Sequence, residues 1–212
     1  MKIEINRRNI SITYLRKKVK RTFIKIVKQS EIIVTSPLKL TEDEIMFFIN
    51  QHIDWITKVI SRINSISLKE DEILLFGEKY RIIEDESLDE YYKVIDEIVF
   101  YKKNGLDKLY KVYYQKIEEQ FNLLNKQLNY NAILGFRKMK TKWGVCHYKA
   151  NKIVLNKVLI HVPYRLVYYI LAHEFTHFVH PNHSKNFYNE LLLICPDYKV
   201  LKKELANYSF LL

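Results

Sequence analysis

The chain has 212 residues, 48% of them hydrophobic, and a formal net charge of +11. This length is enough to bury a core in one domain or one and a half. No run of eighteen apolar residues is present, the first residues lack the apolar segment of a signal peptide, and Cys146 and Cys195 are too few for a disulfide framework. We therefore expect a cytoplasmic protein that does not span a membrane.

The first part of the chain is typical of a β-rich region with one helix. Residues 3–36 are rich in Ile, Val and Thr, and they predict two or three strands. Thr41 followed by Glu44 forms a capping box, which predicts a helix from there to about Ile63. His52 lies on this helix without a nearby ligand partner, so we expect it to be structural or solvated.

Basic residues are concentrated in the same region and raise the alternative of a nucleic-acid partner. Lysine far outnumbers arginine in the chain, and glycine is scarce beside isoleucine, asparagine and tyrosine. This bias is typical of an AT-rich coding sequence rather than of a selected electrostatic surface. Because apolar residues alternate loosely with the basic ones over residues 16–28, we favour a strand with one solvated face. An acidic or phosphate-bearing partner stays open as the alternative. The basic residues are Arg7, Arg8, Arg16, Lys17, Lys18, Lys20, Arg21, Lys25 and Lys28.

The middle of the chain predicts a hairpin, a further strand and a long helix. Residues 72–84 suggest a hairpin about Gly77, and residues 91–102 another strand. A stripe of apolar side chains at helical spacing then predicts an amphipathic helix that packs into the core. The stripe consists of Leu106, Leu109, Tyr113, Ile117, Phe121, Leu124 and Leu128.

Three more strands are predicted after this helix, over residues 132–140, 142–147 and 152–160. Cys146 lies on the second of them. No other cysteine stands at ligand spacing from it, so a buried thiol is favoured over a metal ligand.

The most informative segment reads H-E-F-T-H-F-V-H-P-N-H and begins at His173. An apolar run surrounds its first five letters, and Pro163 suits the first turn of a helix. If residues 163–179 are helical, His173 and His177 lie one turn apart on one face, where two imidazoles can bind one Zn²⁺. Glu174 then lies on the adjacent flank, where a carboxylate can take a proton from water.

His183 is the favoured third ligand. Pro181 ends the helix, because the residue before a proline is pushed out of the α region, and Asn182 tolerates the geometry of a turn. His183 can therefore fold back toward the metal. Its offset from His173 equals that of the metzincin pattern H-E-x-x-H-x-x-G-x-x-H. A histidine replaces the glycine and no methionine follows, so the metzincin label does not apply.

Glu190 and His180 are the other polar candidates near this segment. Glu190, on the following helix, competes with His183 as the third ligand. His180 would lie about 10 Å along the axis from His173 if the helix continued, which is too far for one ion. We interpret His180 as a neighbour of the ligands or a solvated helix end.

The segments M-K-T-K-W-G-V-C, K-I-V-L-N, L-A-H-E-F-T-H, N-H-S-K-N-F-Y and C-P-D-Y together resemble the YgjP-like family of predicted zinc metallopeptidases. The resemblance spans nearly the whole chain, and it implies that His183 is the third ligand. Departures from the family pattern are Lys142 for Arg, Val145 for Ser and Tyr188 for Trp. The matching positions are Trp143, Gly144, Cys146, Leu155, Asn156, Pro163, His173, Glu174, His177, Asn182, His183, Ser184, Phe187, Pro196, Asp197 and Tyr198.

The expected fold class is α+β. We expect residues 1–103 to form an N-terminal β-rich region with one helix. Residues 104–212 are expected to form a small zincin-like metallopeptidase domain, with helices packed on a mixed sheet. In the metallopeptidases that this chain resembles, an edge strand beside the metal helix binds extended peptide, and Trp143–Cys146 or Ile153–Asn156 could take that part.

The expected function is zinc-dependent hydrolysis of peptide bonds, with Zn²⁺ on His173, His177 and His183. Glu174 would take a proton from the attacking water and deliver it to the leaving amine. Candidate donors to the oxyanion are Tyr164, Arg165, Tyr168 and Lys142, and candidates to orient the histidines are Asn156 and Asp197.

Two alternatives from other classes stay open. A metal-dependent hydrolase of phosphate anhydrides, such as a nucleotide pyrophosphatase, would suit the basic charge, although no Gly-rich phosphate loop is present. A non-catalytic, zinc-stabilised module that binds nucleic acid would need a fourth ligand, His180 or Cys146.

Overall fold

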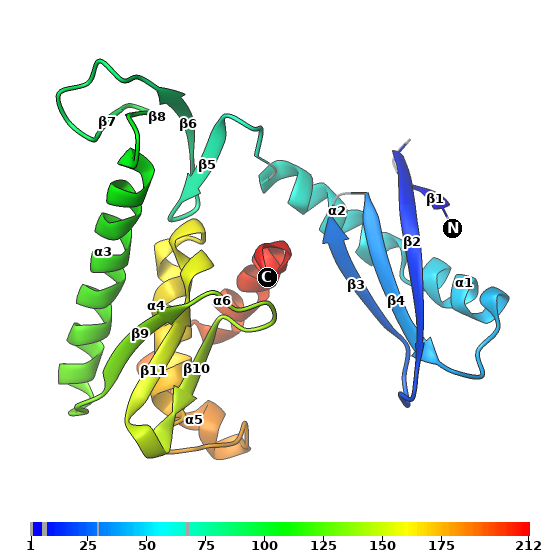
Figure 1. Cartoon of the computed structure of the whole chain (residues 1–212). Coiled ribbons are helices and arrows are strands. Elements are labelled where there is room, and N and C mark those ends of the chain that lie inside the picture. The colour runs from blue at the N-terminus through cyan, green and yellow to red at the C-terminus, as the bar shows by residue number, and fades with distance from the viewer. Residues whose placement is uncertain (1, 6–7, 29, 67) are drawn as a thin grey trace. The chain divides into compact units, whose positions relative to one another are not determined.

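Residues 2–5, 8–28, 30–66 and 68–212 are described by the computed structural model, and they divide into unit 1, Met1–Ser67, and unit 2, Leu68–Leu212 (Figure 1). The fold is mixed α+β, as predicted. Within these residues, no helix is long and apolar enough to cross a membrane. Residues 68–103, which we assigned to the N-terminal region, group with unit 2. Where the catalytic domain begins stays a prediction.

Unit 1 is a four-stranded sheet followed by two helices. The sheet order is β1-β2-β4-β3, with β2 and β4 parallel and the other pairs antiparallel. We predicted two or three strands over this stretch, and the described residues form four. The strands are β1 (Lys2–Ile5), β2 (Arg8–Lys17), β3 (Phe23–Lys28) and β4 (Glu31–Pro37).

The predicted single helix is two helices, α1 (Glu42–Gln51) and α2 (Ile53–Ile66). The capping box at Thr41 is present. The break lies at His52, whose Nδ1 is 2.8 Å from the Phe48 carbonyl oxygen, while its backbone N–H donates to the Ile49 carbonyl. In a continuing α-helix, the His52 backbone N–H would donate to the Phe48 carbonyl; here the His52 side chain occupies that acceptor.

The predicted basic cluster is spread over the end of β2, a turn and β3. On β3, Lys25 is exposed and Ile26 is buried, which agrees with one solvated face. Arg16 and Lys17 end β2, and residues 18–22 form the turn. Arg7 lies outside the described residues.

Unit 2 begins with a second four-stranded sheet, in the order β5-β6-β8-β7. The hairpin predicted at Gly77 is present: Phe76 and Gly77 both have positive φ, and a Cβ on Gly77 would lie 2.6 Å from Pro163 Cγ. Residues 91–102 form two strands instead of one, because Asp96, with φ of 50°, turns the chain. The strands are β5 (Glu72–Leu75), β6 (Glu78–Glu84), β7 (Tyr92–Ile95) and β8 (Ile98–Tyr101).

The long helix α3 (Gly105–Gln127) forms as predicted, and it buries Leu109, Ile117, Phe121 and Leu124. A three-stranded sheet follows, in the order β10-β11-β9, with β10 at one edge. Residues 157–161 are a 3₁₀ helix rather than strand, because the Asn156 side chain accepts the Val158 N–H and turns the backbone. The strands are β9 (Ile133–Arg137), β10 (Gly144–His147) and β11 (Lys152–Asn156).

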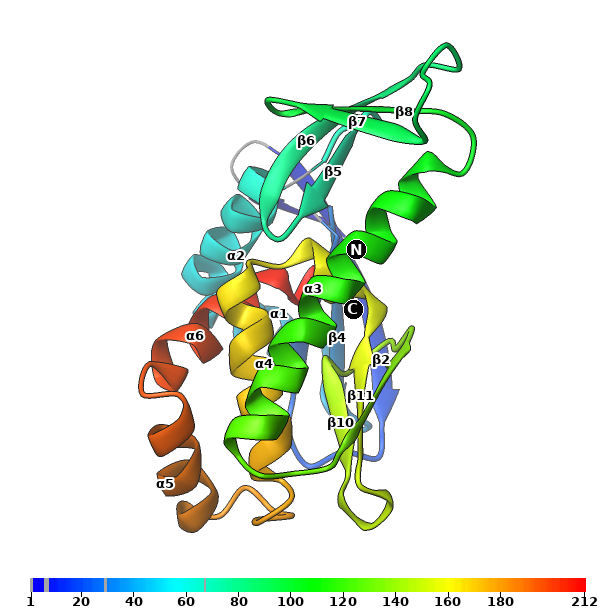
Figure 2. The ribbon, with the colours of Figure 1, turned by 90° about the vertical axis from the view of Figure 1, so that its left-hand side faces the viewer.

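The helix α4 (Tyr164–Thr176) lies at the centre of unit 2. It packs against β10, α3, α5 (Lys185–Ile194) and α6 (Tyr198–Leu205) (Figure 2). Most of its residues are buried, so a polar side chain on this helix must find its partners inside the protein.

Candidate active site

The histidine-rich segment begins on the last turn of α4. The helix ends at Thr176, with His177 as its C-cap, slightly earlier than predicted. His173 and His177 lie side by side on it, with ring centroids 5.0 Å apart. The chain then turns through Pro181 and Asn182 before Ser184 caps α5.

This turn brings His183 back to the helix. One ring nitrogen from each of His173, His177 and His183 lies within 4.8 Å of the others. His173 Nε2 and His183 Nε2 are 3.0 Å apart. Phe187 on α5 packs against all three imidazoles, with centroid distances of 4.9, 4.7 and 4.7 Å, so its ring supports the group from one side.

Backbone contacts orient His177. Its Nδ1 lies 3.1 Å from the carbonyl oxygen of His180, which favours a proton on Nδ1 and leaves Nε2 as a lone-pair donor. The backbone carbonyl of His180 therefore orients the His177 ring, whereas the His180 imidazole is not part of the histidine group. Glu190 is not part of it either: it lines a separate cavity together with His180.

The half-buried imidazole of His173 is neutral at physiological pH. Burial, the neighbouring His177 and His183, and Lys202 lower its pKa to about 3. Its Nδ1 is buried and has no hydrogen-bond partner among the described residues. Burial also lowers the pKa of His177, with His183 adding to the effect. Neutral imidazole is the form that binds a metal ion.

Glu174 is buried beside the histidines, with 6% of its surface exposed. Burial raises its pKa to about 7, although the Cys146 backbone N–H and Lys142 act in the opposite direction. A Cβ on Gly144 would lie 2.9 Å from Glu174 Oε1, so strand β10 passes directly against the carboxylate. Burial and Glu174 raise the pKa of the Cys146 thiol to about 12, which keeps it protonated, and Cys146 is not part of the histidine group.

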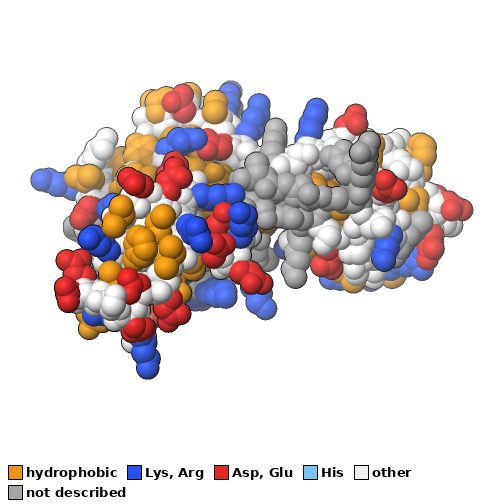
Figure 3. All heavy atoms as spheres, turned by 90° about the horizontal axis from the view of Figure 1, so that it is seen from above, with side chains coloured by type: hydrophobic (Ala, Val, Ile, Leu, Met, Phe, Trp, Pro, Cys, Tyr) orange, Lys and Arg blue, Asp and Glu red, His pale blue; other side chains and the backbone are white. Residues whose placement is uncertain are grey.

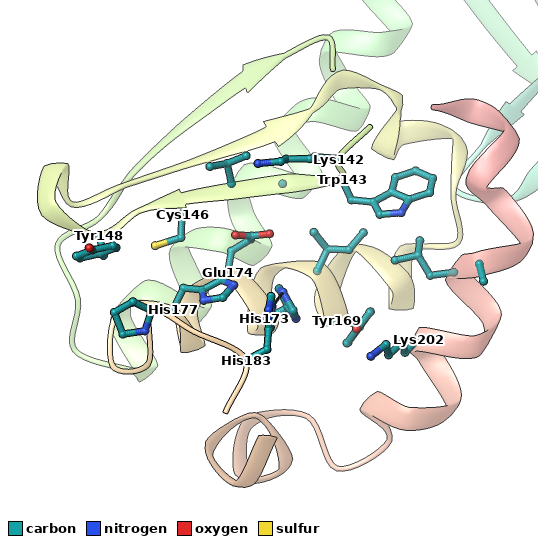
Figure 4. Close-up of a pocket in the computed structure, with 16 residues that line it drawn as sticks. Lys142, Trp143, Cys146, Tyr148, Tyr169, His173, Glu174, His177, His183 and Lys202 are labelled. Carbon is teal, nitrogen blue, oxygen red and sulfur yellow. Dashed lines mark hydrogen bonds between the residues drawn. The ribbon is translucent and has the colours of Figure 1, made fainter. Parts of the chain in front are cut away.

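A pocket of about 560 Å³ opens between β10 and α4 (Figure 4). His173, Glu174, His177 and His183 all line it. One wall comes from the loop before β10 and from β10 itself; the other comes from α4 and α6. An extended chain could therefore lie along the β10 edge and pass over the histidines.

Of the four oxyanion donors expected from the sequence, only Lys142 lines the pocket. Tyr164 Oη donates to the Lys116 carbonyl, Arg165 pairs with Glu204, and Tyr168 Oη donates to the Ile194 carbonyl. These three side chains are engaged elsewhere in the structure.

Asn156 does not orient the histidines. Its Nδ2 donates to the carbonyls of Met139 and Lys142, both at 2.8 Å, and its Oδ1 accepts the Met139 N–H at 3.3 Å. Asn156 is fully buried and holds the loop that leads into β10. Asp197 is the N-cap position of α6 and makes no side-chain capping bond there.

The histidine group fits a tetrahedral metal ion. Ligand nitrogens about 2.0–2.1 Å from zinc in that geometry are roughly 3.3 Å apart, and the three histidine nitrogens lie within 4.8 Å of one another. In the described part of the chain this is the one group of three or more histidine, cysteine or acidic side chains with such spacing. Three protein donors leave one position of a tetrahedron open, as in catalytic rather than structural zinc sites.

Comparison with known proteins gives a family match that spans most of the chain. The sequence model of the YgjP-like metallopeptidase domain matches residues 20–208, which confirms the predicted resemblance. The metallopeptidase zymogen of Pyrococcus abyssi abylysin is similar over 42% of this chain and 90% of its own, with 21% identity and a TM-score of 0.39. The metallopeptidase zymogen of Methanocaldococcus jannaschii jannalysin is similar over 42% of this chain and 96% of its own, with 28% identity and a TM-score of 0.36. No curated protein matches the chain.

Proposed function

This chain belongs to the YgjP-like metallopeptidase domain family, a family of metal-dependent hydrolases, and on that premise we propose that it is a zinc-dependent peptidase. His173, His177 and His183 hold the zinc ion, and Glu174 acts as the general base. The observation that carries the proposal is the convergence of three imidazole nitrogens in one pocket with a buried carboxylate.

The histidines suit this role because two of them have lowered pKa values and the ring of a third faces them. Neutral imidazoles need not lose a proton before they bind a metal. The contact between His177 Nδ1 and the His180 carbonyl is the kind of outer interaction that fixes the tautomer of a ligand. A bound zinc ion supplies a Lewis acid that polarises a carbonyl oxygen and acidifies water.

Glu174 suits the role of a base that later acts as an acid. A group whose pKa is about 7 can both take and release a proton near neutral pH. The Cys146 N–H and the close approach of Gly144 limit the positions that its carboxylate can take. Glu174 accepts a proton from the water that attacks the peptide carbonyl, and it delivers this proton to the amine as the bond breaks.

The substrate binds along β10. This strand is an edge of its sheet, and it lines the same pocket as the histidines. The backbone N–H and C=O groups of an edge strand can pair with an extended peptide. That pairing would hold a peptide bond over the histidine group without a need for particular side chains.

A comparison of wild type with Glu174→Gln tests the proposal. We expect about one zinc per chain in both proteins, and hydrolysis of unstructured protein or peptide substrates in the wild type alone. Loss of about 1000-fold or more in turnover is expected if Glu174 is both base and acid. His177→Ala, as a ligand control, should lose the zinc as well.

Other outcomes would point to other functions. Hydrolysis of nucleoside triphosphates without peptide cleavage would overturn the peptidase proposal in favour of phosphate-anhydride chemistry. Full peptide turnover by Glu174→Gln would overturn the role of Glu174. Tight zinc binding with no hydrolysis of either substrate class would support a structural zinc site.

A further inference from the structure

The pocket extends beyond the histidines toward α6, and apart from Glu174 its charged lining residues are of one sign. Lys142, in the loop before β10, and Lys202, on α6, both line it. Among the described residues, Glu174 is the single carboxylate in the lining. Apart from the proposed catalytic groups, the pocket is therefore lined by two ammonium groups and by apolar or aromatic side chains.

The two ends of the pocket differ in charge. Figure 4 shows Tyr148 at one end and Lys202 at the other, with Glu174 and the histidines between them. Trp143 and Tyr169 lie toward the Lys202 end (Figure 4). A substrate that crosses the histidine group would therefore meet a positive charge on one side of the scissile bond and an uncharged aromatic residue on the other.

Lys202 is held near the histidines by aromatic contacts. Its Nζ lies 5.4 Å from the centroid of the Tyr188 ring, and Tyr188 stacks on His183 with centroids 6.3 Å apart. The ammonium is close enough to His173 to contribute to the lowering of that residue's pKa.

No carboxylate in the described part of the chain pairs with Lys202. Glu204, two residues later on the same helix, is engaged by Arg165 at 2.6 Å. Lys202 thus presents to the pocket a positive charge that no carboxylate of the described residues neutralises.

A substrate carboxylate is the group that would complement this charge. It would gain a partner in Lys202, whereas a basic side chain at the same place would be repelled. We infer that Lys202 is a specificity residue, which makes the pocket select peptides that carry a carboxylate next to the scissile bond. The inference rests on the proposed peptidase function. The carboxylate could belong to an acidic side chain or to a free C-terminus.

The test uses internally quenched peptides with Glu or Gln at each of the two positions on either side of the scissile bond. A second pair differs in a free or amidated C-terminus close to that bond. The enzymes are zinc-loaded wild type, Lys202→Glu and Lys203→Glu. Lys203 is the matched control, because it is an exposed lysine next in sequence on α6 and does not line the pocket.

For wild type we expect kcat/KM to favour the carboxylate peptide by about fivefold at one position, as for a solvent-accessible ion pair. Lys202→Glu should abolish or reverse this ratio, and Lys203→Glu should keep it. The preference should also fall at high ionic strength. Each ratio is measured within one enzyme, so it does not depend on the active fraction. The pair of peptides that shows the effect identifies the source of the carboxylate.

Equal rates for all peptide pairs in wild type would overturn the inference and leave the peptidase function standing. An equal loss of preference in both lysine variants would overturn it as well, because bulk charge would then explain the effect. If wild type cleaves no peptide, the proposed function fails on its own. Fluorescence anisotropy of the same peptides bound to zinc-loaded protein then decides: a carboxylate preference that Lys202→Glu removes supports the inference, and equal affinities overturn it.

Discussion

Gly144→Ala should damage catalysis while it leaves the fold intact. Gly144 lies on strand β10 with an ordinary backbone conformation, so alanine brings no φ strain there. The new methyl group would lie 2.9, 3.0 and 3.1 Å from Oε1, Cγ and Cδ of Glu174. Because these atoms span the side chain, rotation of the carboxylate alone does not relieve the contact.

The size of the effect follows from the distances. Ordinary contacts begin at 3.4 Å, so the carboxylate must move by about 0.5 Å from its present 2.9 Å separation, or β10 must retreat by as much. Either movement also alters the hydrogen bond from the Cys146 N–H to Glu174. A misplacement of about 1 Å in a catalytic group can reduce the rate by roughly 100-fold, so we expect a loss of about ten- to a hundredfold in kcat.

The assay is steady-state peptide hydrolysis, with zinc content and thermal unfolding measured on the same preparations. Gly135→Ala is the control, since Gly135 lies on β9 of the same sheet and its added methyl group would approach the flexible end of Lys152 at 3.3 Å. It should keep wild-type kcat. If Gly144→Ala keeps full kcat with normal zinc, the contact between β10 and Glu174 does not position the base.

Two further predictions concern the histidines. His183→Ala should sharply weaken zinc binding, as measured by competition with a chelator, whereas His180→Ala should nearly preserve it, because His180 contributes its carbonyl; the reverse order would refute the ligand assignment. For His161, burial lowers the pKa below 6.5, although the contact of its Nδ1 with the Leu74 carbonyl, at 2.7 Å, acts in the opposite direction. The unfolded chain therefore binds a proton on His161 more tightly than the folded chain does. The free energy of unfolding is unaffected by this difference above about pH 6.5, and it decreases as the pH falls below that value. Urea unfolding from pH 7.5 to 5 should thus show a shallower pH dependence for His161→Gln than for wild type, and parallel curves would refute this.

Local rules predicted the parts of the site that lie close together in sequence. The helical spacing of His173 and His177 and the flanking position of Glu174 follow from the period of the helix. The return of His183 follows from a proline and an asparagine that end the helix, and the structure brings its ring to the other two. The break between α1 and α2 at His52 was not predicted. The His52 side chain there takes the place of a backbone N–H at the Phe48 carbonyl, and helix propensity does not account for such a contact.

Contacts between residues far apart in the chain could not be predicted from the sequence. Gly144 matched a family motif, but its physical role depends on a helix residue thirty positions later. Asn156 was expected beside the histidines, and it instead satisfies the carbonyls of the loop before β10. Lys202 was not predicted to belong to the site, because only the packing of α6 on α4 brings it to the pocket. On the face drawn in Figure 3, acidic and basic side chains are interspersed, so net charge alone predicted little about partners.

Polar residues buried in unit 2 differ in how far hydrogen bonds compensate their burial. Thr176 Oγ1 donates to the Ala172 carbonyl at 2.7 Å, and Asn156 bonds to the backbone of Met139, Lys142 and Val158. These hydrogen bonds offset the cost of burying both side chains. His173 Nδ1 has no partner among the described residues, and the Glu174 carboxyl is buried at the cost of a pKa raised to about 7. Burial of a carboxyl such as that of Glu174 lowers the stability of the fold unless a ligand compensates for the lost solvation. Replacement of Glu174 by Gln should therefore leave thermal stability unchanged or higher, while replacement of Asn156 by Leu should lower it. The opposite order would mean that Glu174 is a structural residue.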